Sequence, residues 1–349
     1  MVYRGEDEIT PVDNKIDQVW KDVFLFLVTF QDKFYSQNIE QNPSINISEV
    51  KITTTDRKRF IENISTDENF SDFEEFAKLI NSTKFYKILF NIAKDNQVIS
   101  KINDFLNIVD LSEFYYGKIS SLTDYNQIID YLESDSSALN ELGKYFYENG
   151  GILSKVGVKR KYLDDEEFLS KYRQSMVGKP CPYCGERITV VEIDHFLPKS
   201  KYPLLSIYSS NLVPSCVECN KEKKEKLQLP ISHPLKFNHL KYIKFSFNDY
   251  TAIAVPNLDD EGESLLVKNM IEITNFNRLF RESIIAPDLR KLDLIISENP
   301  DDIEKLTDSV GFEFISDIKK KLYKDYVDKC LEQSMLQDYS CFYSISREI

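Results

Sequence analysis

Glycine, histidine and long apolar runs are scarce in this sequence. Only 10 of the 349 residues are Gly and 3 are His, whereas Phe and Tyr number 23 and 20, a balance typical of a largely helical, well-packed protein. The most apolar run, residues 23–28, is far short of the roughly 20 residues that cross a bilayer. Residues 1–8 hold no apolar core followed by a small-residue cleavage site. We therefore expect no secretory signal, no membrane contact and a cytoplasmic location.

Positive charge is also scarce overall, but it is concentrated in one part of the chain. The formal net charge of −13 argues against non-specific adhesion to nucleic acid. Residues 155–226 carry 14 Lys or Arg against 10 Asp or Glu, whereas the remaining residues carry 30 against 47. The central region is thus net positive although the chain is acidic. An ordinary solvated surface would give the same numbers, so charge alone does not assign a function.

Apolar periodicity predicts a mainly helical chain with a few strands. Helical spacing covers residues 13–34, 98–109, 139–147, 164–176 and 319–336. The β-branched residues of 188–193 indicate a strand, and residues 241–247 with 250–255 indicate a hairpin. We expect the helical pattern after residue 273 to break at Pro287 and again near Asn299.

Four of the six cysteines form two Cys-x-x-Cys pairs, Cys181 with Cys184 and Cys216 with Cys219. In a cytosolic chain this spacing favours a metal over disulfides. Four thiolates in two tight turns suit a closed tetrahedral Zn²⁺ site, which would hold in place the residues between the pairs. A redox pair would need only one such motif and a thioredoxin-like context, which the sequence does not indicate.

Between the two pairs lies an Asp-His dipeptide, Asp194-His195, at the end of the predicted strand. By itself the dipeptide favours a fifth metal ligand or a buried structural histidine. Phosphodiester hydrolysis, however, needs a base for water and a cation against the developing negative charge. A neutral His can be that base. Asp and Asn oxygens can hold Mg²⁺ or Mn²⁺.

The segment from Cys181 to Lys223 resembles the HNH, or ββα-metal, nuclease motif of the zinc-stapled, McrA-like kind. The resemblance implies that His195 is the general base and that Asp194 binds the catalytic Mg²⁺ or Mn²⁺. It implies that Asn211 orients the histidine by hydrogen bonding and that Asn220 is the second metal ligand. Many members have His at the last position, but an amide oxygen can replace an imidazole on a hard cation.

A longer string, Asp-His-Phe-x-Pro-Lys-Ser-x-Tyr-Pro over residues 194–203, resembles a narrower group. It is similar to the HNH components of Septu-type and retron-associated bacterial defence systems, which act beside an ATPase. Residues 273–279 also resemble a helical segment that follows the nuclease motif there. The resemblance implies a role in anti-phage defence or restriction and a partner ATPase.

Lysines flank the motif on both sides: Lys199, Lys201, Lys221 and Lys223. They would neutralise nucleic-acid phosphates without reading sequence. Lys224 and Lys226 fit a solubilising helix face equally well. His233 and His239 follow in a Pro-containing stretch and are interpreted as structural.

The sequence thus predicts an α+β, mainly helical fold with a zinc-stapled ββα-metal motif embedded between helical regions. We expect a helical domain over 1–153 that docks a partner, an HNH domain over 154–235, and a hairpin with a C-terminal helical region over 236–349. The leading hypothesis is a DNA endonuclease. A ribonuclease using the same site, for example on tRNA, and a zinc-stabilised nucleic-acid-binding module without catalysis are the alternatives.

Overall fold

The computed structural model describes most of the chain between residues 13 and 345. The described residues are 13–38, 82–107, 133–134, 136–147, 168–206, 208, 211–231, 233–235, 237–298 and 317–345, with 55, 58 and 62. The chain packs as two compact units. The first comprises Met1–Ser175 and Ile193–Val213, and the second comprises Met176–Glu192 and Pro214–Ile349. The segment from Cys181 to Lys223 therefore contributes residues to both units, with its four cysteines in the second.

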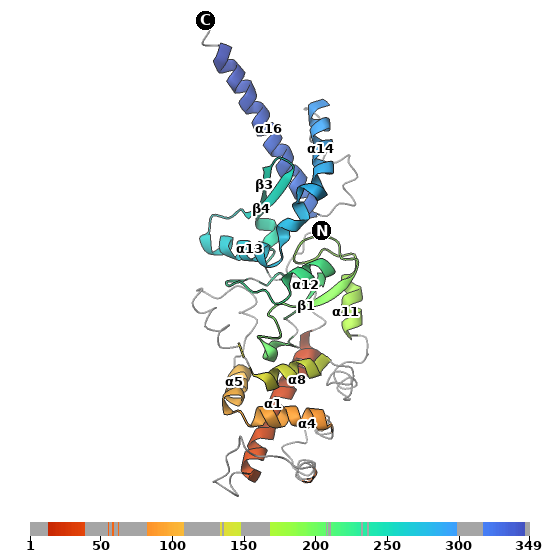
Figure 1. The fold of residues 1–349 in the computed structure, drawn as a ribbon, viewed down its shortest axis with the longest axis vertical. Coiled ribbons are helices and arrows are strands. Elements are labelled where there is room, and N and C mark those ends of the chain that lie inside the picture. The colour runs from red at the N-terminus through yellow and green to blue at the C-terminus, as the bar shows by residue number, and fades with distance from the viewer. Residues whose placement is uncertain are drawn as a thin grey trace. The chain divides into compact units, whose positions relative to one another are not determined.

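Helices make up most of the described part of the first unit (Figure 1). They are α1 (Asp13–Asn38), α4 (Thr83–Ala93), α5 (Asn96–Asn107), α8 (Ser137–Tyr147) and most of α11 (Phe168–Met176). Helix α4 contacts α1, α5 and α8, so it lies at the centre of this group. Its apolar positions are buried, and Phe85 stacks on Tyr145 of α8 with ring centroids 5.5 Å apart. Ser82 caps the start of α4 by accepting a hydrogen bond from Phe85 N.

The same unit contains the loop between two short strands. Strand β1 (Val191–His195) and strand β2 (Leu212–Cys216) pair in a two-stranded sheet, and the 3-10 helix η3 (Pro203–Leu205) lies between them in sequence. Helix α8 contacts η3 directly. The loop is therefore packed against the N-terminal helices through α8.

The second unit combines the cysteine turns with the C-terminal elements. In chain order these are α12 (Val217–Lys223), η5 (His239–Tyr242), β3 (Ile243–Asn248), β4 (Thr251–Pro256), α13 (Glu261–Ile273), η6 (Phe276–Phe280), α14 (Glu282–Glu298) and α16 (Asp317–Ile345). Strands β3 and β4 are antiparallel, with Ile243 opposite Pro256 and Asn248 opposite Thr251. Helix α13 packs on β4 and α16 on β3, so apolar hairpin residues are buried.

These elements confirm the expected fold class, which is mainly helical with two small two-stranded sheets. The hairpin prediction and the long final helix are also confirmed. The expected boundary at residue 153 lies outside the described residues, and the three-part domain division stays a prediction.

Two local predictions were wrong. The expected break at Pro287 does not occur, because α14 continues through it to Glu298. A single proline removes one backbone donor, and burial of Ile285 and Leu289 favours the continuous helix. The strand expected over 188–193 begins three residues later, at Val191. Ile188 instead exchanges backbone hydrogen bonds with Gly178 and Lys179 across the first cysteine turn.

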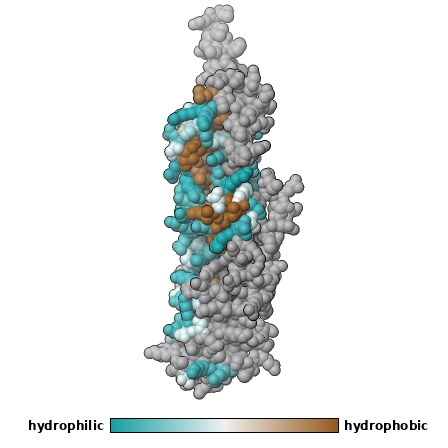
Figure 2. Space-filling view, turned by 90° about the vertical axis from the view of Figure 1, so that its right-hand side faces the viewer, coloured by the Kyte–Doolittle hydropathy of each residue, from teal (hydrophilic) through white to brown (hydrophobic). Residues whose placement is uncertain are grey.

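The surface of the described residues is mostly hydrophilic on the face that Figure 2 draws, with apolar areas between. Within the described ranges, six large apolar side chains are exposed: Leu25, Val177, Val190, Ile253, Ile284 and Leu294. Among the described helices, none combines the length and apolar character that a membrane-crossing segment requires.

Candidate functional site

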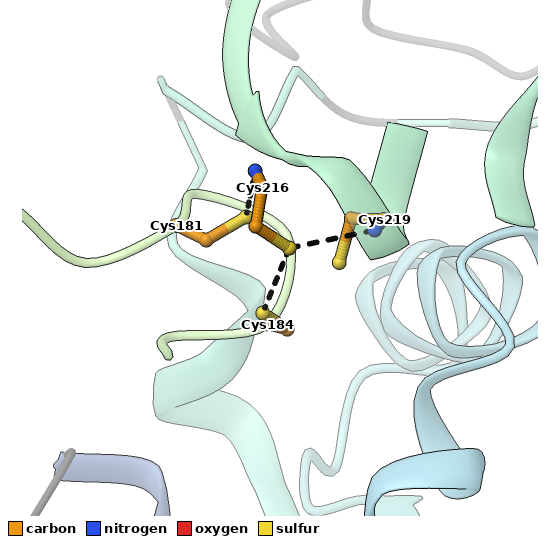
Figure 3. Close-up of side chains that lie close together, drawn as sticks. All are labelled: Cys181, Cys184, Cys216 and Cys219. Carbon is orange, nitrogen blue, oxygen red and sulfur yellow. Dashed lines mark hydrogen bonds between the residues drawn. The ribbon is translucent and has the colours of Figure 1, made fainter. Parts of the chain in front are cut away.

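Four buried cysteines converge in the second unit (Figure 3). Their Sγ atoms all lie within 4.8 Å of one another. Cys181 and Cys184 occupy a tight turn that closes with hydrogen bonds from Gly185 N to Cys181 O and from Cys181 N to Glu186 O. Cys216 ends β2 and caps α12, where its Sγ accepts from Cys219 N at 3.4 Å. Four converging thiols on two turns fit one tetrahedral zinc ion.

Gly185 is required where it stands, for two reasons. Its φ of 74° lies in the left-handed region that favours glycine. A Cβ atom there would lie 3.2 Å from Leu240 Cδ1 and 3.3 Å from Ile318 Cβ. The first cysteine turn is therefore packed directly against η5 and the start of α16, which fixes the position of both of its thiols.

His239 supports the same turn from η5. Its Nε2 lies 3.0 Å from the carbonyl oxygen of Tyr183, between the two cysteines, so the neutral ring donates from Nε2. Burial lowers the pKa of His239 to about 4, even though the carbonyl bond works to raise it. This placement agrees with the structural interpretation of His239 and keeps the ring uncharged at neutral pH.

Arg278 faces the cysteine cluster from η6, and the sequence reasoning missed it. Its Nη2 donates to Cys219 Sγ at 3.6 Å, while Nη1 donates to Thr274 O and Asn275 O. Burial works to lower the pKa of Arg278, but the bond to Cys219 and the neighbouring thiolates raise it overall. A guanidinium beside four thiolates offsets part of their negative charge. No local signal reveals this, since 59 residues separate Arg278 from Cys219.

The loop after β1 holds His195 by a backbone contact. His195 Nε2 lies 2.8 Å from the carbonyl oxygen of Ser206. A carbonyl oxygen can only accept, so Nε2 carries the ring proton and the lone pair is on Nδ1. Asp194, the preceding residue, is buried. Ser206 was not among the predicted site residues, because a backbone carbonyl gives no sequence signal.

Asn211 is fully buried and ties the two ends of that loop together. Its Nδ2 donates to Leu197 O and Leu205 O, and its Oδ1 accepts from Leu197 N at 2.7 Å. The resemblance implied that Asn211 orients His195. In the structure its amide bonds reach the backbone of Leu197 and Leu205, which both follow the histidine in the chain, so any such effect passes through the loop.

Asn220 lies on α12, and its side chain pairs with Glu192 on β1. Asn220 Nδ2 donates to Glu192 Oε2. Because a carboxylate accepts only, this pair turns the amide so that Oδ1, the atom that could bind a cation, faces away from Glu192. Glu192 was not predicted. The alternation of side chains along a strand could have indicated Glu192, since residues 192 and 194 lie on the same face of β1.

The flanking lysines divide into exposed and buried. Lys199, Lys201 and Lys221 are exposed, as expected for phosphate contacts. Lys223, however, is fully buried, so its prediction as a surface contact for nucleic acid was wrong. Residue 223 follows Cys219 by four positions on α12 and therefore shares its inward face, a consequence of helical periodicity rather than of charge.

Comparison with known proteins agrees with this geometry. Residues 181–226 match the family model described as HNH endonuclease. Protein ea31 of Escherichia phage lambda is 41% identical over 78 residues, which are 22% of this chain and 24% of that protein. Septu protein PtuB of Bacillus thuringiensis is 27% identical over 186 residues, 50% of this chain and 61% of that protein. The chain thus spans less than two thirds of either relative, and no solved structure matches it. The matches confirm the predicted resemblance to HNH nucleases and to a Septu component.

Proposed function

We propose that this chain is a metal-dependent DNA endonuclease with His195 as general base. The proposal is supported by the match of residues 181–226 to the HNH endonuclease family model. The observation that carries the role of His195 is its bond to Ser206 O. With the ring proton held on Nε2, the basic nitrogen is Nδ1 and the imidazole enters the reaction in one tautomer. A base held in one orientation needs no reorganisation before it accepts a proton from water.

Asp194 and Asn220 would hold the catalytic Mg²⁺ or Mn²⁺. The chemistry of these donors supports the assignment, since both offer oxygen atoms, which hard divalent ions prefer. The pairing of Asn220 Nδ2 with Glu192 further supports it, because Oδ1 is then the amide atom left to bind a cation. Such an ion would supply positive charge against the scissile phosphate and the leaving oxygen.

The four buried cysteines would hold a structural Zn²⁺, separate from the catalytic ion. A closed set of four sulfur ligands leaves no coordination position for substrate, so this ion has no part in the reaction. Its role is to join the first cysteine turn to the start of α12. That junction also positions Asn220, the residue after Cys219.

We extend the proposal to anti-phage defence beside a partner ATPase. The support is the similarity to Septu protein PtuB over half of the chain, together with the string over residues 194–203. Exposed Lys199, Lys201 and Lys221 support a nucleic-acid substrate, because they can neutralise phosphates near the motif. Lysine contacts of this kind do not read sequence, so the cleavage preference is set elsewhere.

The test uses the purified, zinc-loaded full chain. Supercoiled plasmid, single-stranded DNA and tRNA are incubated separately with Mn²⁺, with Mg²⁺ or with EDTA. We expect plasmid cleavage that stops in EDTA and returns with either ion. Cleavage of tRNA alone would replace the DNA assignment with the ribonuclease alternative. Binding without cleavage in every mixture would favour the non-catalytic module.

The matched variants are His195→Ala and Asp194→Ala. Both should retain one zinc per chain and the wild-type circular dichroism spectrum while losing cleavage. Removing a general base typically costs about 10²–10⁴-fold in rate. A His195→Ala protein that cuts at the wild-type rate would refute the assigned base.

A further inference from the structure

Helix α8 approaches the His195 loop closely at one residue, Gly143. This glycine is buried in the middle of the helix, where glycine is among the least favourable residues. A Cβ atom added at Gly143 would lie 3.3 Å from Ser206 Oγ, 3.5 Å from Ser206 Cβ and 3.8 Å from Pro203 O. The first distance is shorter than an ordinary contact, so Ser206 Oγ would have to shift by a few tenths of an ångström. Glycine at this position therefore permits the close approach of α8 to Ser206.

Ser206 is also the residue whose carbonyl oxygen accepts from His195 Nε2 at 2.8 Å. One residue thus contacts α8 through its side chain and His195 through its main chain. Ser206 N donates to Pro203 O at 3.2 Å, which ties the residue to η3. Because Cβ and the carbonyl carbon of Ser206 are bonded to the same Cα, a shift of this residue away from α8 would also move the carbonyl oxygen that accepts from His195.

The N-terminal helical region also holds the beginning of this segment. Ser134 N donates to Lys201 O at 2.9 Å, and Lys201 Nζ lies 3.9 Å from a carboxylate oxygen of Glu133. The backbone carbonyl of Glu133 accepts in turn from Lys101 Nζ at 2.9 Å, which anchors it to α5. Residues 201–206 are thus fixed at one end by residues 133–134 and at the other by α8.

We propose that the N-terminal helical region positions the general base, with Gly143 and Ser206 as the positioning residues. The inference rests on the proposed role of His195 and assigns the helical region a part in the reaction. Neither residue touches the substrate; both act through the place and orientation of the imidazole. Misplacing a reacting group by about 1 Å can cost on the order of 100-fold in rate. The helical region thereby sets the turnover rate of the nuclease domain.

A purely structural role for Gly143 makes different predictions. In that case Gly143→Ala would change stability and activity together, and changing Ser206 would not restore either. If Gly143 positions the base, the added methyl group should lower kcat and leave KM unchanged. Removing Ser206 Oγ should then relieve the effect, because the next distance, 3.5 Å to Ser206 Cβ, is an ordinary contact.

The experiment compares Gly143→Ala, Ser206→Ala and the double variant as zinc-loaded full chains. Glu141→Ala, on the exposed side of α8, is the matched control. We expect Gly143→Ala to lose about tenfold or more in kcat with KM within about twofold, as misplacement of the base implies. Ser206→Ala keeps the carbonyl that accepts from His195 Nε2, and it gives the reference rate for the double variant. The double variant should recover most of the loss.

A second readout does not depend on cleavage. The sequence has three histidines, so ¹⁵N-histidine labelling gives a spectrum simple enough to assign by substitution. Gly143→Ala should shift the Nε2–H signal of His195, and the double variant should return it. A Gly143→Ala protein with wild-type kcat and an unchanged His195 signal would refute the proposal. A fully active His195→Ala protein would instead remove the proposed base, while the spectrum still tests the contact between α8 and His195.

Discussion

Acid destabilisation through His239 is the most quantitative expectation from this structure. His239 is 1% exposed, and its Nε2 donates to Tyr183 O inside the first cysteine turn. Protonation would place a positive charge at a position that water does not reach. Burial therefore lowers the pKa of His239 to about 4, from an ordinary value of 6.5.

The direction in which pH changes the free energy of unfolding depends on which state, folded or unfolded, binds the proton. Between pH 6.5 and about 4 the unfolded chain is protonated at residue 239 and the folded protein is not, so acid favours unfolding. The free energy of unfolding should fall by about 1.4 kcal/mol for each pH unit within this window. The total is about 3 kcal/mol, reached near pH 4. Above pH 6.5 both states are neutral at this residue, and its contribution is constant.

The assay compares wild type with His239→Gln by urea unfolding of the zinc-loaded protein from pH 7 to pH 4.5. Glutamine can still donate to Tyr183 O but does not titrate. Thiolate protonation weakens zinc binding in both proteins, so the difference between the two curves isolates residue 239. The stability difference should shift by about 2 kcal/mol in favour of the variant between pH 7 and pH 5. Parallel curves across this range would show that His239 titrates normally in the folded protein and would refute the reasoning.

Three further expectations concern the cysteine cluster and Asn220. Cys216→Ser should abolish stoichiometric zinc binding and unfold the second unit, whereas Cys330→Ser should leave the metal content unchanged; equal zinc in both would end the four-cysteine assignment. Arg278→Gln should speed zinc transfer to a chelator about tenfold or more, because residues that hydrogen-bond to a metal ligand contribute to metal affinity. Arg278→Lys should be intermediate. Unchanged kinetics would contradict the idea that the guanidinium offsets the negative charge of the thiolates. Glu192→Ala should weaken Mn²⁺ binding more than Glu192→Gln does, because glutamine keeps an acceptor for Asn220 Nδ2. Electron paramagnetic resonance measures the bound Mn²⁺. Equal losses in the two variants would mean that Glu192 acts by its charge.

The sequence by itself determined the elements whose signals are local. The two Cys-x-x-Cys pairs predict the cluster, because each pair needs only one tight turn to bring its thiols together. Apolar periodicity located helix α1 and the β3–β4 hairpin for the same reason, since neighbouring residues on one face must be buried together. The family match over residues 181–226 agrees with the motif that these local patterns marked.

Only the tertiary structure decided which distant residues support the site. Arg278 reaches Cys219 across 59 positions, and Gly143 meets Ser206 across more than 60. Lys223 has the charge of a surface residue, yet its position on α12 buries it. Such contacts depend on how whole elements pack, and packing energy is summed over many weak contacts rather than encoded at one position. A backbone carbonyl such as that of Ser206 is present in every residue, so only its position in the fold gives it a role.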